Sequence, residues 1–120
     1  MSSVRVLIVD DSEPYRLALH EAVEAAPGFE VVAAVDSGEA AIGRAAEARP
    51  DLVLIDVRMP GLGGVAAAER IAERHPDVLV VMITADSAGR SIDRARFPVV
   101  DKRSLSPSTV AELWQKRRAR

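Results

Sequence analysis

Residues 52–60 have the sequence LVLIDVRMP, and this stretch decides the fold of the chain. Its apolar residues show no polar alternation, which predicts a short strand buried on both faces, as in a parallel sheet. Pro60 cannot prolong that strand, because its ring fixes φ and removes a backbone donor. Asp56 is therefore expected at the carboxyl end of a central strand, where open α/β sheets form their ligand crevices.

The composition indicates a single globular domain over residues 1–120. A hydrophobic content of 48% supports a core and exceeds that of disordered chains. The absence of cysteine excludes disulfide bonds and thiolate metal sites. No apolar run is long enough to span a bilayer and no signal-peptide pattern opens the chain, which favours a cytoplasmic protein without a membrane partner. The net charge of -2 argues against a general nucleic-acid binder, although residues 116–120 are basic.

Apolar runs alternate with helical patterns along the chain. Strands are expected at residues 4–9, 29–35, 52–56, 78–83 and 97–100, and helices after the capping residues Ser12 and Ser37, near Gly64, and from Ser106. Tyr15 is expected on the inward face of the first helix. Residues 86–96 give a weak helical signal, so a short or irregular fourth helix is expected there. This alternation predicts an α/β fold with a parallel sheet covered by helices on both faces.

Polar side chains follow or end four of the predicted strands. They are Asp10 and Asp11 after the first, Asp56 at the end of the third, Thr84 after the fourth and Lys102 after the fifth. Because parallel strands end at the same edge of a sheet, these side chains are expected to converge.

Such a cluster suits phosphoryl chemistry. Three neighbouring carboxylates repel one another, and a hard divalent cation such as Mg²⁺ relieves that repulsion with oxygen ligands. The Asp56 carboxylate can act as a nucleophile toward phosphorus, since phosphoryl transfer needs mainly positioning and charge neutralisation. Lys102 supplies a mobile cation and the Thr84 hydroxyl supplies a donor for phosphoryl oxygens.

On these residues, nearly the whole chain resembles the receiver domain of two-component response regulators, and most of all the receivers of helix-turn-helix regulators of the NarL/LuxR type. The motifs that carry the resemblance are Val9-Asp10-Asp11-Ser12, Asp56-Val57-Arg58-Met59-Pro60-Gly61 with Gly64, Ile83-Thr84-Ala85, and Asp101-Lys102. The resemblance implies a flavodoxin-like three-layer fold with strand order 2-1-3-4-5.

The resemblance also implies a function. Asp56 would accept a phosphoryl group from a sensor histidine kinase or a small phosphodonor, with Thr84 and Lys102 contacting that group. The metal ligands of Mg²⁺ would be Asp10, Asp11, Asp56 and the Arg58 backbone carbonyl. Such a domain is not an enzyme beyond a possible self-dephosphorylation.

The output of a receiver would run through the helix of residues 86–96, the strand of residues 97–100 and the last helix, a face that could also support a homodimer. DNA would be reached only through a separate effector domain. The chain departs from the usual receiver pattern here, with Pro98, Val99 and Val100 where an aromatic residue is common and Arg103 where proline often follows the lysine.

Two alternatives stay open from the sequence. One is a degenerate or stand-alone receiver that works through protein contacts without phosphorylation. The other is a phosphohydrolase with Asp56 as nucleophile. The second is disfavoured, because Arg58 stands where such enzymes place a general acid.

Overall fold

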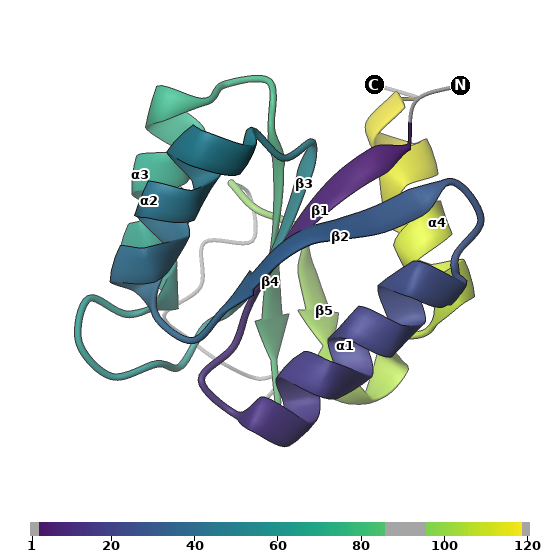
Figure 1. The fold of residues 1–120 in the computed structure, drawn as a ribbon, viewed down its shortest axis with the longest axis horizontal. Coiled ribbons are helices and arrows are strands. Elements are labelled where there is room, and N and C mark those ends of the chain that lie inside the picture. The colour runs from purple at the N-terminus through teal and green to yellow at the C-terminus, as the bar shows by residue number, and fades with distance from the viewer. Residues whose placement is uncertain (1–2, 86–95, 119–120) are drawn as a thin grey trace.

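A computed structural model describes residues 3–85 and 96–118 as one α/β unit (Figure 1). In chain order its elements are β1 (Val4–Val9), α1 (Glu13–Ala25), β2 (Phe29–Val35), α2 (Gly38–Ala48), β3 (Leu52–Asp56), α3 (Gly64–Arg74), β4 (Leu79–Thr84), β5 (Val99–Asp101), the 3₁₀ turn η1 (Lys102–Ser104) and α4 (Pro107–Arg118). The helix expected within residues 86–96 falls almost wholly outside the described residues.

The sheet has the predicted order, β2-β1-β3-β4-β5, and every neighbouring pair of strands is parallel. Helices α2 and α3 lie on one face of the sheet, and α1 and α4 lie on the other (Figure 1). Asp56 pairs with Ile83 and Thr84 pairs with Asp101, so the carboxyl ends of three adjacent strands lie at nearly the same level. The expectation of a flavodoxin-like three-layer fold is confirmed.

The central strand explains the two-sided core. All five residues of β3 are buried. Because successive strand side chains point to opposite faces, Val53 and Ile55 join the cluster beneath α2 and α3, whereas Leu52 and Leu54 join the cluster beneath α1 and α4. Burial of each such side chain contributes about 1.5–3 kcal/mol relative to exposure. The apolar run of β3 therefore serves both layers of the fold.

The helix starts follow local chemistry, with one difference from expectation. Ser37 caps α2 as predicted, its Oγ accepting a hydrogen bond from the Ala40 N–H. Ser12 occupies the capping position of α1, but its side chain makes no capping hydrogen bond. Its backbone N–H donates to Asp10 Oδ1 instead, at 2.9 Å. The start of α1 is thus tied to Asp10.

The last strands are displaced from the predicted ranges. The fourth strand begins and ends one residue later than expected, which makes Thr84 its final residue. The fifth was expected at residues 97–100 and occupies Val99–Asp101. Pro98 has no N–H for the ladder, so it precedes the strand and contributes only its carbonyl, which accepts from Met82.

None of the helices in the described ranges is both long and apolar enough to cross a membrane.

Candidate functional site

An acidic cluster lies at the carboxyl edge of the sheet. Asp10 and Asp11 follow β1, Asp56 ends β3, and one carboxylate oxygen from each lies within 4.8 Å of the others. Asp10 is fully buried and Asp56 is 5% exposed, whereas Asp11 is exposed to solvent. The structure therefore brings together the three carboxylates that sequence analysis selected.

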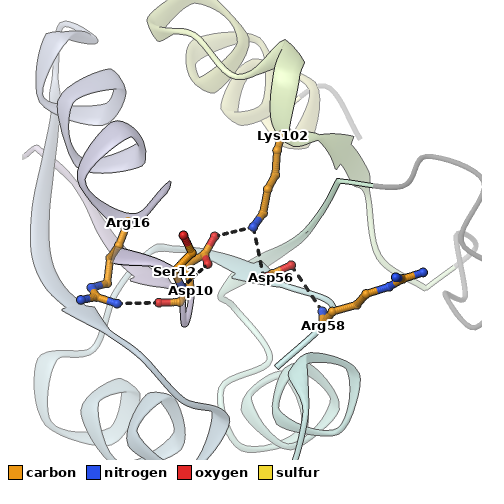
Figure 2. Close-up of polar contacts among 6 residues, drawn as sticks. All are labelled: Asp10, Ser12, Arg16, Asp56, Arg58 and Lys102. Atoms are coloured by element: carbon orange, nitrogen blue, oxygen red, sulfur yellow. Dashed lines mark hydrogen bonds and ion pairs between the residues drawn. The ribbon is translucent and has the colours of Figure 1, made fainter. Parts of the chain in front are cut away.

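Lys102 joins the cluster from the first position of η1, directly after β5. Its Nζ lies 2.9 Å from Asp10 Oδ2 and 3.2 Å from Asp56 Oδ2. Figure 2 shows the lysine reaching between the two carboxylates, and its side chain is only 7% exposed. A lysine that is usually a solvated surface residue is here drawn into the site by two buried negative charges.

Asp10 anchors the neighbouring backbone as well as the lysine. Its Oδ1 accepts the Ser12 N–H, and its carbonyl accepts the Arg16 guanidinium at 2.8 Å (Figure 2). Its Oδ2 is buried and accepts no regular hydrogen bond from the described residues, so the contact with Lys102 is an ion pair. Lys102 is therefore the cation that balances the charge of this buried oxygen.

The loop after β3 is held close to Asp56. The Arg58 N–H donates to Asp56 Oδ1 at 3.3 Å, while the Arg58 side chain extends away from the carboxylate (Figure 2). The Val57 N–H donates to the Ile83 carbonyl at 2.9 Å, which ties the loop to β4. These contacts fix the orientation of the Asp56 carboxylate. The role expected for the Arg58 carbonyl remains a prediction.

Thr84 also lies at this edge, as the last residue of β4, and is 2% exposed. It follows Ile83, the register partner of Asp56, and itself pairs with Asp101. Its place beside the central strand agrees with the expected convergence of the five side chains.

The surroundings of the cluster raise the pKa of both Asp56 and Lys102. Burial raises the pKa of the Asp56 carboxyl above its ordinary 3.8, and the negative charge of Asp10 raises it further, against a lowering by Lys102. Burial alone would lower the pKa of the Lys102 ammonium, but its contacts with Asp10 and Asp56 outweigh burial and raise that pKa. The lysine is therefore held charged, and a further cation beside Asp10 and Asp56 would relieve the repulsion that contributes to the raised pKa of Asp56.

The donor set fits a hard divalent cation. Carboxylate oxygens are the ligands that such ions prefer, and Mg²⁺ needs only one or two of them because it keeps several waters. Asp11 is exposed to solvent, and one of its oxygens lies within 4.8 Å of the buried oxygens of Asp10 and Asp56. The acidic cluster is thus suited to a cation of this class.

Two contacts were not foreseen from the sequence. Tyr15 was expected to face the core but is 44% exposed, and Lys102 Nζ lies 4.1 Å from the centroid of its ring. Asp101 accepts two hydrogen bonds from the Arg103 side chain and one from its N–H, which lower the pKa of Asp101 to about 2. An aromatic residue four positions after an acidic pair at a sheet edge is the signal that could have indicated the first contact.

Comparison with known proteins agrees with this geometry. Residues 6–99 match the family model of the response regulator receiver domain. The chain belongs to this family. It is therefore a receiver domain of the response regulators of two-component signalling, a family in which aspartyl phosphorylation and Mg²⁺ binding are usual. Lys102 lies just beyond the residues that match the family model, so its place beside Asp10 and Asp56 is known from the structure.

Two curated relatives illustrate the range of proteins that contain such a receiver. The chain is 42% identical over 81 residues to the response regulator GacA of Pseudomonas viridiflava, covering 68% of this chain and 38% of that protein. It is 36% identical over 115 residues to a protein-glutamate methylesterase/protein-glutamine glutaminase of Anaeromyxobacter dehalogenans, covering 93% and 33%. The chain thus spans 38% and 33% of the length of these two relatives, the second of which is an enzyme.

Solved structures support the fold. The signal receiver domain of a modulated diguanylate cyclase from Desulfovibrio desulfuricans G20 is 28% identical with a TM-score of 0.84, covering 96% of this receiver and 93% of that chain. A DNA-binding response regulator of the LuxR family from Staphylococcus aureus, at 24% identity, has a TM-score of 0.82 and covers 94% and 97%. The second likeness concerns the fold alone.

Proposed function

We propose that Asp56 is the phosphoacceptor of this receiver. The observation that carries the proposal is the place of Lys102, whose ammonium lies within 3.2 Å of both Asp10 Oδ2 and Asp56 Oδ2. Two buried carboxylates and one buried ammonium leave the site with one excess negative charge before exposed Asp11 is counted. The carboxylates of such a site can bind a cation, and its ammonium can bind a tetrahedral anion beside that cation.

The reaction requires little covalent chemistry from the protein. A carboxylate oxygen of Asp56 forms a bond to phosphorus while the bond from phosphorus to the donor's nitrogen or oxygen breaks. The leaving group keeps the bonding electron pair, so acetyl phosphate releases acetate, whereas the nitrogen of a phosphohistidine donor takes a proton from solvent as it leaves. Lys102 neutralises charge on a phosphoryl oxygen, and the Thr84 hydroxyl donates to another.

Asp10, Asp11 and Asp56, with the Arg58 carbonyl, are proposed to hold Mg²⁺. When bound, that ion neutralises charge on the phosphoryl oxygens. Asp10 supplies a buried oxygen that lacks a regular hydrogen bond, and Asp11 supplies one that is open to solvent. The Arg58 N–H orients the Asp56 carboxylate, which leaves one of its oxygens directed toward Lys102.

The partner class follows from the family. Response regulator receivers take their phosphoryl group from a sensor histidine kinase, and we propose the same for this chain, in the cytoplasm and with residues 1–120 as one receiver domain. The proposed output face comprises β5, α4 and the expected helix of residues 86–96, and the same face is proposed to support a homodimer. Contact with DNA is assigned to a separate effector domain.

The test uses acetyl phosphate and Mg²⁺ with the wild-type chain and with Asp56→Asn. Mass spectrometry is expected to detect one phosphoryl group on the wild type, in the peptide that contains Asp56, and none on the variant. Equal labelling of both proteins, or labelling of neither, would contradict the proposal and favour a receiver that acts through protein contacts alone.

The output face is tested separately. Sedimentation of the chain is measured with Mg²⁺ alone and with beryllofluoride added as a phosphoryl mimic. Dimerisation or amide NMR shifts in β5 and α4 are expected after addition. An unchanged mass together with unchanged signals in these elements would show that this face does not respond.

A further inference from the structure

Tyr15 covers the lysine at the acidic cluster. It stands in the first turn of α1, and Lys102 Nζ lies 4.1 Å from the centroid of its ring. The tyrosine is 44% exposed, whereas the Lys102 side chain is only 7% exposed. The ring therefore forms part of the cover that separates the ammonium from solvent.

Asp10, which pairs with Lys102, also sets the position of the Tyr15 ring. Asp10 receives hydrogen bonds from the Ser12 N–H and the Arg16 guanidinium, at 2.9 and 2.8 Å. Both contacts hold the start of α1 against the end of β1. Because Tyr15 lies between Ser12 and Arg16, this anchor fixes its backbone relative to the cluster.

The ammonium is thus approached by three different groups. Carboxylates of Asp10 and Asp56 take two of its contacts, and the face of the Tyr15 ring takes a third. An aromatic face attracts a cation through its quadrupole, and the attraction grows where water is excluded. Since a lysine side chain has a flexible four-carbon stem, each fixed contact removes alternative orientations.

We propose that Tyr15 is a positioning residue for Lys102, its ring face holding the ammonium over Asp56. The inference rests on the proposed phosphoacceptor function and adds a residue to it. A phosphoryl group arriving at Asp56 gains most from an ammonium that already points there, because no reorganisation is then needed. Removal of the ring frees the lysine to adopt other orientations and admits water, so transfer slows although Asp56 is intact.

The test measures the rate of Asp56 phosphorylation by acetyl phosphate and Mg²⁺, since a small donor needs no protein docking surface. The variants are Tyr15→Phe, Tyr15→Leu and Tyr15→Ala, with Leu17→Ala as a control at a 59% exposed position of the same helix. Tyr15→Phe and Leu17→Ala are expected to match the wild type. Tyr15→Leu and Tyr15→Ala are expected to react about two- to fivefold more slowly, the factor to which a cation–π contact of this kind corresponds.

A second readout does not depend on phosphorylation. Tyr15 is the single tyrosine of the chain, so its ring signals in an NMR spectrum are assigned without ambiguity. Lys102→Met, which removes the ammonium, is expected to shift these ring signals. Lys116→Met, an exposed lysine of α4, is expected to leave them in place.

The outcomes separate this inference from the function on which it rests. If Tyr15→Leu is phosphorylated at the wild-type rate, or if Lys102→Met does not shift the Tyr15 ring signals, the positioning role is overturned. Labelling of the wild type at Asp56 would still support the phosphoacceptor function. Failure of the wild type to label at Asp56 overturns both proposals. Thermal unfolding checks each variant, and Tyr15→Leu, which keeps an apolar side chain at an exposed position, carries the test if Tyr15→Ala does not fold.

Discussion

Gly64 lies directly against the backbone of Asp56. A Cβ built on Gly64 would overlap the carbonyl oxygen of Asp56 and stand 3.0 Å from the Cα of Val57. The Gly64 N–H donates to the Val57 carbonyl at 3.3 Å, so the start of α3 and the end of β3 are in contact through main-chain atoms. The loop that leaves Asp56 is therefore closed by a residue without a side chain.

Gly64→Ala is expected to lower the free energy of unfolding by about 2–4 kcal/mol. The added methyl group would meet backbone atoms of Asp56 and Val57, which cannot move aside as a flexible side chain could. The variant is also expected to lose Mg²⁺ affinity, since Asp56 and its loop must move together. Urea denaturation followed by Trp114 fluorescence measures the first effect, and Mg²⁺ titration measures the second.

Gly43→Ala is the matched control. Gly43 lies within α2, and a Cβ there would meet no atom within 4 Å. Alanine at an exposed helix interior is expected to stabilise the protein by up to about 1 kcal/mol. If the two alanine variants were equally stable, the close approach of Gly64 to Asp56 would not matter energetically.

Much of this geometry could be predicted from the sequence. Apolar runs without alternation identify buried parallel strands, and topology then places Asp10, Asp56 and Lys102 at one edge. What the sequence could not indicate is how far each side chain reaches. Helical spacing places Tyr15 on the stripe of Leu19 and Val23, which are both buried. At the first turn that stripe contacts Lys102 instead of core residues.

Local backbone effects account for the remaining differences. Pro98 lacks the N–H that would extend the ladder, so β5 starts at Val99 and carries Asp101 into the sheet. The pair formed by Asp101 and Arg103 depends on the 3₁₀ turn after β5, which has no periodic signature in the sequence. Short-range geometry of this kind becomes visible only when the backbone is known.

Asp56→Asn is expected to stabilise the protein by about 1 kcal/mol when divalent cations are absent, because it removes one of two buried, mutually repelling carboxylates. Added Mg²⁺ should then stabilise the wild type more than the variant, since a ligand stabilises the native state more when its affinity for that state is higher. Thermal or urea unfolding with EDTA and with Mg²⁺ measures both effects. Asp77→Asn, an exposed residue before β4, is the control and should change neither value.

The pH dependence of this difference has a definite sign. The pKa of Asp56 is raised above 3.8 in the folded protein by burial and by Asp10. Between 3.8 and the folded pKa, the native state binds more protons than the unfolded state, so stability falls as pH rises. The free energy of unfolding of the wild type minus that of Asp56→Asn should therefore decrease with rising pH across this window. A difference that increases there would contradict the raised pKa.

Lys102→Met is expected to lower the free energy of unfolding by about 2–4 kcal/mol without divalent cations, because Asp10 and Asp56 are then buried without their shared ammonium. Mg²⁺ should recover part of this loss, since the cation replaces the missing positive charge beside both carboxylates. Urea denaturation of the variant, with EDTA and with Mg²⁺, measures the loss and its recovery. Lys116→Met, at an exposed position of α4, should stay within about 0.5 kcal/mol of the wild type. A Lys102→Met protein as stable as that control would show that the two ion pairs contribute nothing to the fold.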